Sequence, residues 1–326
     1  MNNISAVAPS ADREPQGTQA NPSALVAAIV VIYQLTDPHL LQRLLCSVMD
    51  QVAITFLIDN TPVNCAKTFP IQIEPNARVV HIPLGDNTGV ANAQNVGIAR
   101  ALEEGYSHVL LLDHDSALPP QVIQRLLAAE TKLKACGVRV AAIGPVFQDE
   151  KTGEYSTAVR ASHILPKRFS LDLGSKSPVE TDHLIASGSL ISADALNAVG
   201  LMRGDFFIDW VDIEWGLRAK KLGYKSFICP NAIMRHSIGD ASVKFLGKSI
   251  SLHSDFRNYC IVRNGMYLLK TSQYLGRQWK MVIILKIPKY LVFCPFHSKR
   301  PFHCFFLLLR GIVDGWSGNL GSLEVH

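Results

Sequence analysis

Charged residues are scarce in this chain of 326 residues. Asp, Glu, Lys and Arg make up 18% of it, below the usual quarter, whereas hydrophobic residues make up 48%. The mean hydropathy is slightly positive, at +0.16. A chain of this size can bury a large core, in one big domain or two smaller ones. The composition also indicates extra apolar surface, of the kind that contacts a membrane.

Paired cysteines, a leader and a membrane span are also missing. The seven cysteines are odd in number and form no C-x-x-C pair, which argues against a disulfide framework or a zinc site and fits a reducing compartment. Residues 1–23 have no basic start, and charged residues precede the first apolar run, so this is not a signal peptide. We expect a disordered tail there. The apolar run over residues 24–33 is too short to span a bilayer.

Acidic residues are absent from one long stretch. Residues 256–313 contain ten Lys and Arg but no Asp or Glu, whereas the rest of the chain has 22 basic and 27 acidic residues. The formal net charge of +5 therefore belongs to the C-terminal region. We expect a helix over residues 255–270, followed by apolar and basic segments at 277–294 and 302–313. Such a region fits either a packed helical cap or, as we favour, binding to an anionic membrane surface. No nucleic-acid motif is present, so nucleic acid is not an expected partner.

Apolar runs and helix signals alternate through the first half of the chain, which predicts an α/β domain with a mostly parallel sheet flanked by helices. The expected strands cover residues 25–33, 53–58, 79–83, 107–112 and 138–146, and the expected helices 38–49, 88–104 and 119–135. No glycine-rich G-x-G-x-x-G or G-x-x-x-x-G-K-[ST] motif follows the first strand. If the domain binds a nucleotide, groups other than a glycine-rich loop hold its phosphates.

Two carboxylates follow the fourth expected strand. Asp113 and Asp115 stand one residue apart, at the carboxyl end of the strand, where open α/β sheets bind their ligands. Alternate strand residues face the same side, so we expect both carboxylates to meet one divalent cation, with phosphate oxygens and water completing its shell. An Asx-turn leaving the strand is the structural alternative.

A second stretch with candidate catalytic residues runs from Phe206 to Arg218. We expect a helix over residues 210–222, closed by Gly223. Asp212 falls in its first turn, where the helix dipole favours a charged carboxylate, and this suits a general base. Glu214 lies one turn before Arg218, which predicts a structural ion pair. The alternative makes Asp212 an ordinary acid at a helix start.

Polar residues also follow other strands. Tyr33, Asp59 and Asn87 come after the first three expected strands, and a group of them at one sheet edge is typical of a nucleotide site. His236 follows a later apolar segment. A lone histidine there is usually a packed or turn residue, and it becomes a metal ligand only if the fold brings it to Asp113. An imidazole beside two carboxylates favours an ion such as Mn²⁺.

Together these stretches resemble bacterial rhamnosyltransferases of glycosyltransferase family 2, which have the GT-A fold. The resemblance covers about residues 25–315 and keeps the family order. The matching segments are 59–60 (DN), 87–97 (NTGVANAQNVG), 111–116 (LLDHDS), 207–218 (FIDWVDIEWGLR), 236–240 (HSIGD), and 257–259 with 263–264 (RNY and RN). Two departures stand out: His114 occupies the centre of the D-x-D motif, and the first strand ends in Tyr-Gln-Leu-Thr-Asp-Pro.

The resemblance implies inverting transfer of L-rhamnose from dTDP-L-rhamnose to a hydroxyl of a glycan or lipid-linked acceptor. It assigns donor binding to Tyr33, Asp59, Asn87 and Asp113. It assigns the binding of Mg²⁺ or Mn²⁺ to Asp113, Asp115 and His236. Asp212 would be the general base, and Trp210 and Trp215 would contact the acceptor. We expect a GT-A domain over residues 24–253 and a helical, membrane-associating region over 254–326. We also expect the protein in the cytoplasm, peripheral at the inner face of the cell membrane.

Other functions remain open on the sequence. The donor sugar is not fixed, and UDP-galactofuranose is the main alternative. A nucleotidyltransferase would need a glycine-rich, basic loop near the first strand, which residues 32–38 lack. A non-catalytic, membrane-associated sugar-binding protein would not need the carboxylates at positions 113, 115 and 212.

Overall fold

A computed structural model of the chain describes residues 25–65, 78–149, 152–236, 242–245, 248–251 and 253–322. The expected N-terminal tail lies outside these residues. Within them, no helix is long and apolar enough to cross a membrane.

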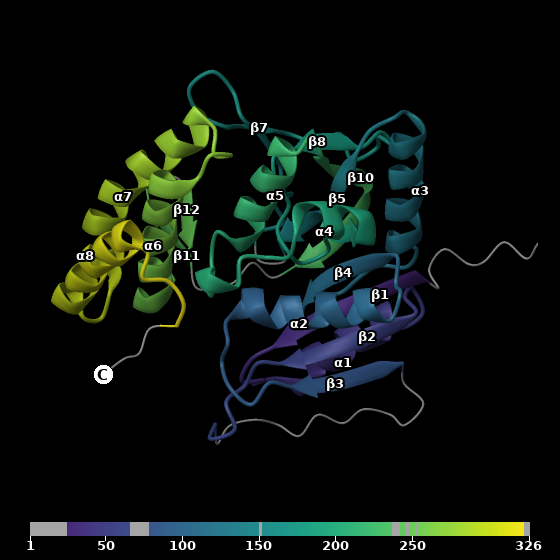
Figure 1. The fold of residues 1–326 in the computed structure, drawn as a ribbon, viewed down its shortest axis with the longest axis horizontal. Helices are drawn as coiled ribbons and strands as arrows, with labels where there is room; N and C mark the ends of the chain where they lie inside the picture. Colours follow the sequence, from purple (N-terminus) through teal and green to yellow (C-terminus); the bar gives the residue numbers. More distant parts are fainter. Residues whose placement is uncertain are drawn as a thin grey trace, which may run out of the picture.

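An eight-stranded sheet forms the centre of the molecule, in the order β3-β2-β1-β4-β9-β5-β10-β8 (Figure 1). Its strands are β1 (Val26–Ile32), β2 (Ile54–Asp59), β3 (Val79–Pro83), β4 (His108–Asp113), β5 (Val140–Asp149), β8 (Val179–Thr181), β9 (Leu190–Ser192) and β10 (Lys225–His236). Only β9 and β8 run antiparallel to their neighbours, so the mostly parallel sheet expected from the sequence is confirmed. Two small hairpins, β6 (Ala158–Arg160) with β7 (Lys167–Phe169) and β11 (Ser242–Phe245) with β12 (Lys248–Ser251), complete the strands of the described residues.

Helices cover both faces of this sheet because successive strand residues point to opposite sides. In β1, Val26 and Ala28 pack with α1 (Pro38–Val48) and α3 (Val122–Ala135), whereas Ala27 and Ile29 pack with α2 (Val90–Glu103). The second face also carries α4 (Ala193–Val199) and α5 (Val211–Lys221). Strands buried on both faces explain why these runs are continuously apolar.

Three C-terminal helices, α6 (Asp255–Thr271), α7 (Arg277–His297) and α8 (Pro301–Ser317), lie together at one side of the molecule (Figure 1). They are joined to the rest through the core, because Trp279 and Ile283 of α7 are buried in the same cluster as Trp210. The indole N–H of Trp279 also donates to Asp182 at 2.9 Å. The expected division at residue 254 stays a prediction, and the first half of α7 packs as part of the main core.

Several element boundaries differ from expectation. Helix α2 begins at Val90 with Gly89 as its N-cap, because Asn87 and Thr88 are bound by Asn60 instead. Helix α3 begins at Val122, after the proline pair, because Gln121 adopts a left-handed backbone. The apolar segment before His236 is one long strand, β10, with an irregularity in its pairing.

Candidate active site

The D-x-D motif stands at the carboxyl edge of the sheet, as expected, but only its first carboxylate belongs to a strand. Asp113 ends β4, and its backbone N–H donates to the Ser187 hydroxyl at 3.2 Å. Asp115 lies in a turn that the N–H of Ser116 closes on the Asp113 carbonyl, at 3.1 Å. The alternation of a strand therefore does not set the relation between the two carboxylates. This turn is closed by backbone atoms, so the Asx-turn that was the structural alternative stays a prediction.

The backbone beside His236, the third expected metal ligand, lies close to the turn that holds Asp115. Ala117 forms an isolated antiparallel bridge with Arg235, which immediately precedes His236 at the end of β10. The His236 side chain lies outside what the structure describes. Among the described side chains, no three His, Cys, Asp or Glu form a group that fits a metal ion. The metal set of Asp113, Asp115 and His236 therefore stays a prediction.

The residues expected to hold the nucleotide follow the neighbouring strands β1, β2 and β3. Tyr33 is exposed, at 43% of its surface. Asp59 lies 3.2 Å from the His81 Nε2 and accepts from the Thr61 N–H. The Asn87 Oδ1 accepts from the Asn60 amide at 3.0 Å and from the Gly89 N–H. Asn87 thus shapes the loop before α2, whereas Tyr33 presents an exposed ring.

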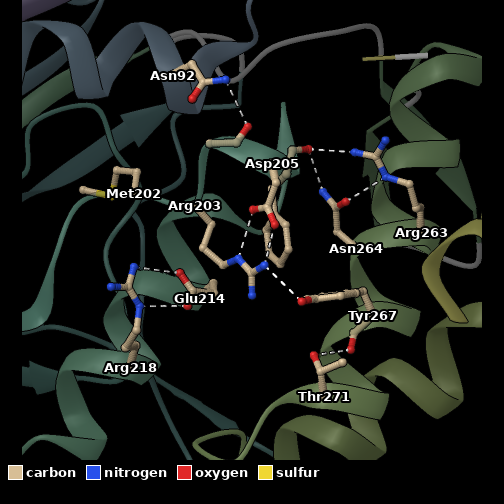
Figure 2. A network of polar contacts seen from close by, with 12 residues as sticks. Asn92, Met202, Arg203, Asp205, Glu214, Arg218, Arg263, Asn264, Tyr267 and Thr271 are labelled. Carbon is tan, nitrogen blue, oxygen red and sulfur yellow. Dashed lines mark hydrogen bonds and ion pairs between the residues drawn. The ribbon is translucent and has the colours of Figure 1, made fainter. Parts of the chain in front are cut away.

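The asparagines of α2 hold a second loop in place, a role that the sequence did not reveal. The Asn95 side chain exchanges two hydrogen bonds of 2.9 Å with the backbone of Met202. Asn92 donates to the Gly204 carbonyl at 3.3 Å, as Figure 2 shows. A Cβ atom on Gly89 would lie 2.7 Å from Phe207, so glycine is needed there. The segment 87–97 therefore positions the loop that leads to Asp212.

That loop enters α5 through a strained backbone. Phe207, Asp209 and Trp210 have φ angles of +65°, +64° and +66°. Bulky residues seldom adopt this left-handed conformation, which costs of order 1–3 kcal/mol for each residue. The strain persists only if the surroundings fix the turn, and such strain clusters at functional sites.

Helix α6 supplies the contacts that fix this turn. The buried Asn264 amide donates to the carbonyls of Phe206, Ile208 and Asp209, at 3.0, 3.0 and 3.1 Å. The buried Arg263 donates to the same Phe206 carbonyl at 3.0 Å and to the Asn264 Oδ1 at 3.0 Å (Figure 2). Because Arg263 engages the Asn264 oxygen, the amide nitrogen faces the turn. The RN pair of the C-terminal region is thus part of the site architecture.

Two further contacts join α6 to the turn. Arg257 forms an ion pair with Asp209, with 2.8 Å between Nη2 and Oδ1. The Trp210 indole donates to the Ile261 carbonyl at 3.0 Å. The strained residues are therefore anchored by their side chains as well as by their carbonyls.

Asp212 follows this turn and is half-buried in the first turn of α5, where its Oδ1 accepts from the Ile213 N–H at 2.8 Å. Desolvation, together with the negative charges of Asp209 and Asp113, raises its pKa to about 6. The contribution of Asp113 means that the end of β4 and the start of α5 share one electrostatic environment. A carboxylate with a pKa near 6 is mostly ionised at neutral pH and matches the needs of a general base.

The expected ion pair of Glu214 and Arg218 is confirmed. Glu214 is fully buried, and two guanidinium nitrogens lie 2.9 and 3.1 Å from its oxygens (Figure 2). The Tyr274 hydroxyl donates to the same carboxylate at 2.6 Å. Glu214 is therefore a packing residue that ties α5 to the segment after α6.

The two tryptophans expected to contact the acceptor are largely buried. Trp210 and Trp215 are 6% and 3% exposed, and the Trp215 indole donates to the Gly200 carbonyl at 2.8 Å. Trp215 also lines, with Asp212 and Gln94, a cavity of about 20 Å³, enough for about one water molecule. The structure thus gives both rings a packing role, and the acceptor contact stays a prediction.

His183 is a residue beside this site that the sequence did not single out. Its Nδ1 is buried without a hydrogen-bond partner among the described residues, and desolvation lowers its pKa to about 4. It packs edge-on against Trp279, and a Cβ atom on Gly216 would lie 2.9 Å from it. A neutral histidine therefore lies against α5, one turn after Asp212. Only the glycine at position 216 leaves a local sequence signal for it.

Comparison with known proteins identifies the family. Residues 28–200 match the family described as Glycosyl transferase family 2. The chain belongs to glycosyl transferase family 2. It is also 34% identical over 250 residues to the dTDP-rhamnosyl transferase RfbF of Shigella flexneri, covering 76% of this chain and 80% of RfbF.

Solved structures support the same fold for this family 2 chain. TarS 1–349 of S. aureus in complex with UDP-GlcNAc matches with a TM-score of 0.54 at 12% identity, over 89% of this chain and 81% of TarS. GalNAc-T7 with UDP, GalNAc and Mn²⁺ matches with a TM-score of 0.52 at 15% identity, over 90% and 57% of the two chains. The expected GT-A fold is confirmed, and the protein is a glycosyltransferase.

Replacing Asn264 tests the role of α6 in holding the turn. Asn264→Ala leaves buried carbonyls without their donor, so we expect unfolding in urea to require about 2–4 kcal/mol less free energy. Displacement of Asp212 should also lower the transfer rate by roughly 100-fold. Asn319→Ala, at an exposed asparagine, is the matched control and should stay within about 0.5 kcal/mol of wild type. Equal stability of the two variants would show that the turn does not depend on α6.

Proposed function

We propose that this glycosyltransferase transfers L-rhamnose from dTDP-L-rhamnose to a hydroxyl group of a glycan or lipid-linked acceptor, with inversion at the anomeric carbon. The proposal rests on one observation above all, the electrostatic proximity of Asp212 and Asp113 at the carboxyl edge of the sheet. The choice of dTDP-rhamnose is supported by the identity of 34% to RfbF, whose name states that donor. Transfer from UDP-galactofuranose by the same chemistry is the alternative.

In the proposed site, Asp113 lies where the donor diphosphate departs. Asp113 and Asp115, with His236 beside their turn along the backbone, are oxygen and nitrogen ligands that suit Mg²⁺ or Mn²⁺. A bound divalent ion would neutralise charge on the leaving diphosphate. Tyr33, exposed after β1, and Asp59, after β2, are the proposed contacts of the nucleotide.

Asp212 acts in this proposal as the general base. Its carboxylate takes the proton of the acceptor hydroxyl as that oxygen attacks the anomeric carbon. The bond from the anomeric carbon to the diphosphate oxygen breaks on the opposite face, and dTDP departs with the bonding electrons. One displacement inverts the configuration, so the chain needs no covalent nucleophile. The strained turn before α5 fixes where the carboxylate stands.

The C-terminal helices are the proposed contact with the inner face of the cell membrane. Large apolar side chains are exposed along α7 and α8, together with interspersed Lys and Arg. The exposed group includes Ile284, Leu285, Val292, Phe296, Phe302, Phe306, Val313 and Trp316. Apolar side chains combined with basic charge favour the surface of an anionic bilayer. The acceptor would then be met at the membrane.

Replacing Asp212 tests the catalytic assignment. We expect Asp212→Asn to bind dTDP-L-rhamnose as wild type does and to lose transfer by roughly 10²–10⁴-fold, because the amide does not accept the proton. The readout is release of dTDP in the presence of a panel of glycan and lipid-linked acceptors. Asp194→Asn, at an exposed carboxylate of α4, is the matched control with the same charge change. A rate near that of wild type in the first variant would remove Asp212 as the base.

The raised pKa of Asp212 predicts how stability depends on pH. Between about pH 4 and 6 the folded protein binds more protons at this group than the unfolded chain, so its ionisation destabilises the fold above about pH 6. We therefore expect Asp212→Asn to gain free energy of unfolding over wild type at pH 8, and the gain to shrink as the pH falls from 6 towards 4. Urea unfolding in the absence of divalent ions measures this difference. A difference that is constant across this range would contradict the burial and like-charge environment described above.

A further inference from the structure

A cavity of about 150 Å³ lies between α6 and α7, and none of the residues proposed to bind the donor or the metal lines it. By this measure one water molecule needs about 10–15 Å³, so the space accommodates a polar group much larger than water. Its basic and polar lining consists mainly of His253, Lys286, Lys289, Tyr290, His297 and Ser298. Lys286, Lys289 and Tyr290 are three and four residues apart, so they share one side of α7.

The two lysines of this cavity lie close enough to repel one another. Neither Lys286 nor Lys289 forms an ion pair with a described residue, and Lys286 instead lies 5.9 Å from the Trp210 ring. Although its side chain is partly exposed, desolvation of its ammonium lowers the pKa of Lys286, and the charges of Arg168 and Lys289 lower it further. Asp209 acts in the opposite direction, but it is paired with Arg257. An anion in the cavity would relieve this repulsion.

The one carboxylate in the lining is already engaged. Asp255, at the start of α6, accepts a hydrogen bond of 2.8 Å from the Ser298 hydroxyl. The other residues that α6 contributes lie at its N-terminal end, where the helix dipole is positive. Tyr290 keeps its proton, because desolvation raises its pKa to about 12, and so it remains a hydrogen-bond donor. The lining thus combines two ammonium groups, one hydrogen-bonded carboxylate and neutral donors.

Exposed apolar side chains near the cavity indicate that its anionic ligand is attached to a hydrocarbon chain. Val292 and Phe296, on the same half of α7, are 63% and 82% exposed, and Phe302 at the start of α8 is 82% exposed. Free inorganic phosphate gains nothing from such neighbours. A phosphate group attached to an acyl or other hydrocarbon chain places its head in the cavity while its tail lies along these side chains.

We propose that the cavity between α6 and α7 is a binding site for the phosphate group of an anionic lipid, held by Lys286 and Lys289. The proposal rests on the membrane contact put forward above and gives that contact a defined ligand chemistry. It involves no turnover, so its test is independent of rhamnosyl transfer. Lys286 of the lining also lies over the ring of Trp210, which belongs to the turn that leads to Asp212.

A soluble probe and a vesicle probe test this site. Glycerol 3-phosphate, titrated by calorimetry, should bind wild type and lose at least tenfold in affinity in Lys286→Gln/Lys289→Gln, since hydrogen bonds between charged groups contribute about 1.5–3 kcal/mol. Lys280→Gln/Lys299→Gln removes the same charge outside the lining and should bind like wild type. Retained binding in the cavity variant would overturn the proposal. So would displacement of glycerol 3-phosphate by dTDP, which would assign the cavity to the donor.

Vesicles identify the source of the phosphate. With phosphatidylglycerol in phosphatidylcholine, we expect the cavity variant to lose at least tenfold more affinity than the control variant, in a sedimentation assay at fixed ionic strength. Equal losses would reduce the membrane contact to general electrostatics, and they would overturn the lipid assignment even if glycerol 3-phosphate bound the cavity. Thermal unfolding verifies that both variants fold. Binding of dTDP-L-rhamnose, measured separately, reports on the proposed transferase function alone.

Discussion

The site depends on three hydrogen bonds that the Asn264 amide donates to backbone carbonyls of the turn before α5. They act on a segment in which three residues other than glycine have positive φ angles, at a cost of order 1–3 kcal/mol for each. Arg263 orients that amide, and the asparagines of α2 hold the preceding loop from the other side. Asp212 stands where it does because two distant segments of the chain fix the same loop.

The C-terminal region therefore has a structural role in holding the turn before Asp212. The helices that carry the exposed apolar side chains, α7 and α8, pack with α6, which contacts the turn before Asp212. Trp279, at the start of α7, is buried against the core that holds Trp210. A membrane contact through α7 and α8 would therefore be mechanically connected to Asp212 through α6. Removal of the whole region is a poor test of membrane binding, because it also removes core side chains.

The sequence predicts the sheet well because apolar runs bounded by polar turns carry the information locally, as in β1 and β4. It also predicts the pairing of Glu214 with Arg218, which are one helical turn apart. It is wrong about some element ends. The helix expected from residue 88 begins at Val90 because Asn60 binds Asn87 and Thr88, and Asp115 lies outside the strand because the Ser116 N–H closes a turn on Asp113. The roles of Asn95, His183 and Asn264 depend on partners 55 or more positions away, and no local pattern encodes them.

The most direct test of the proposed function is donor binding. We would titrate dTDP-L-rhamnose and UDP-galactofuranose into wild type and Asp113→Ala, each with and without Mn²⁺ or Mg²⁺, by calorimetry. The account predicts that wild type prefers the dTDP-sugar, that binding tightens with the ion, and that this tightening is lost in the variant. Preference for the UDP-sugar would change the donor while keeping the chemistry. Binding that no ion affects, in either protein, would contradict the role proposed for Asp113 and with it the central claim.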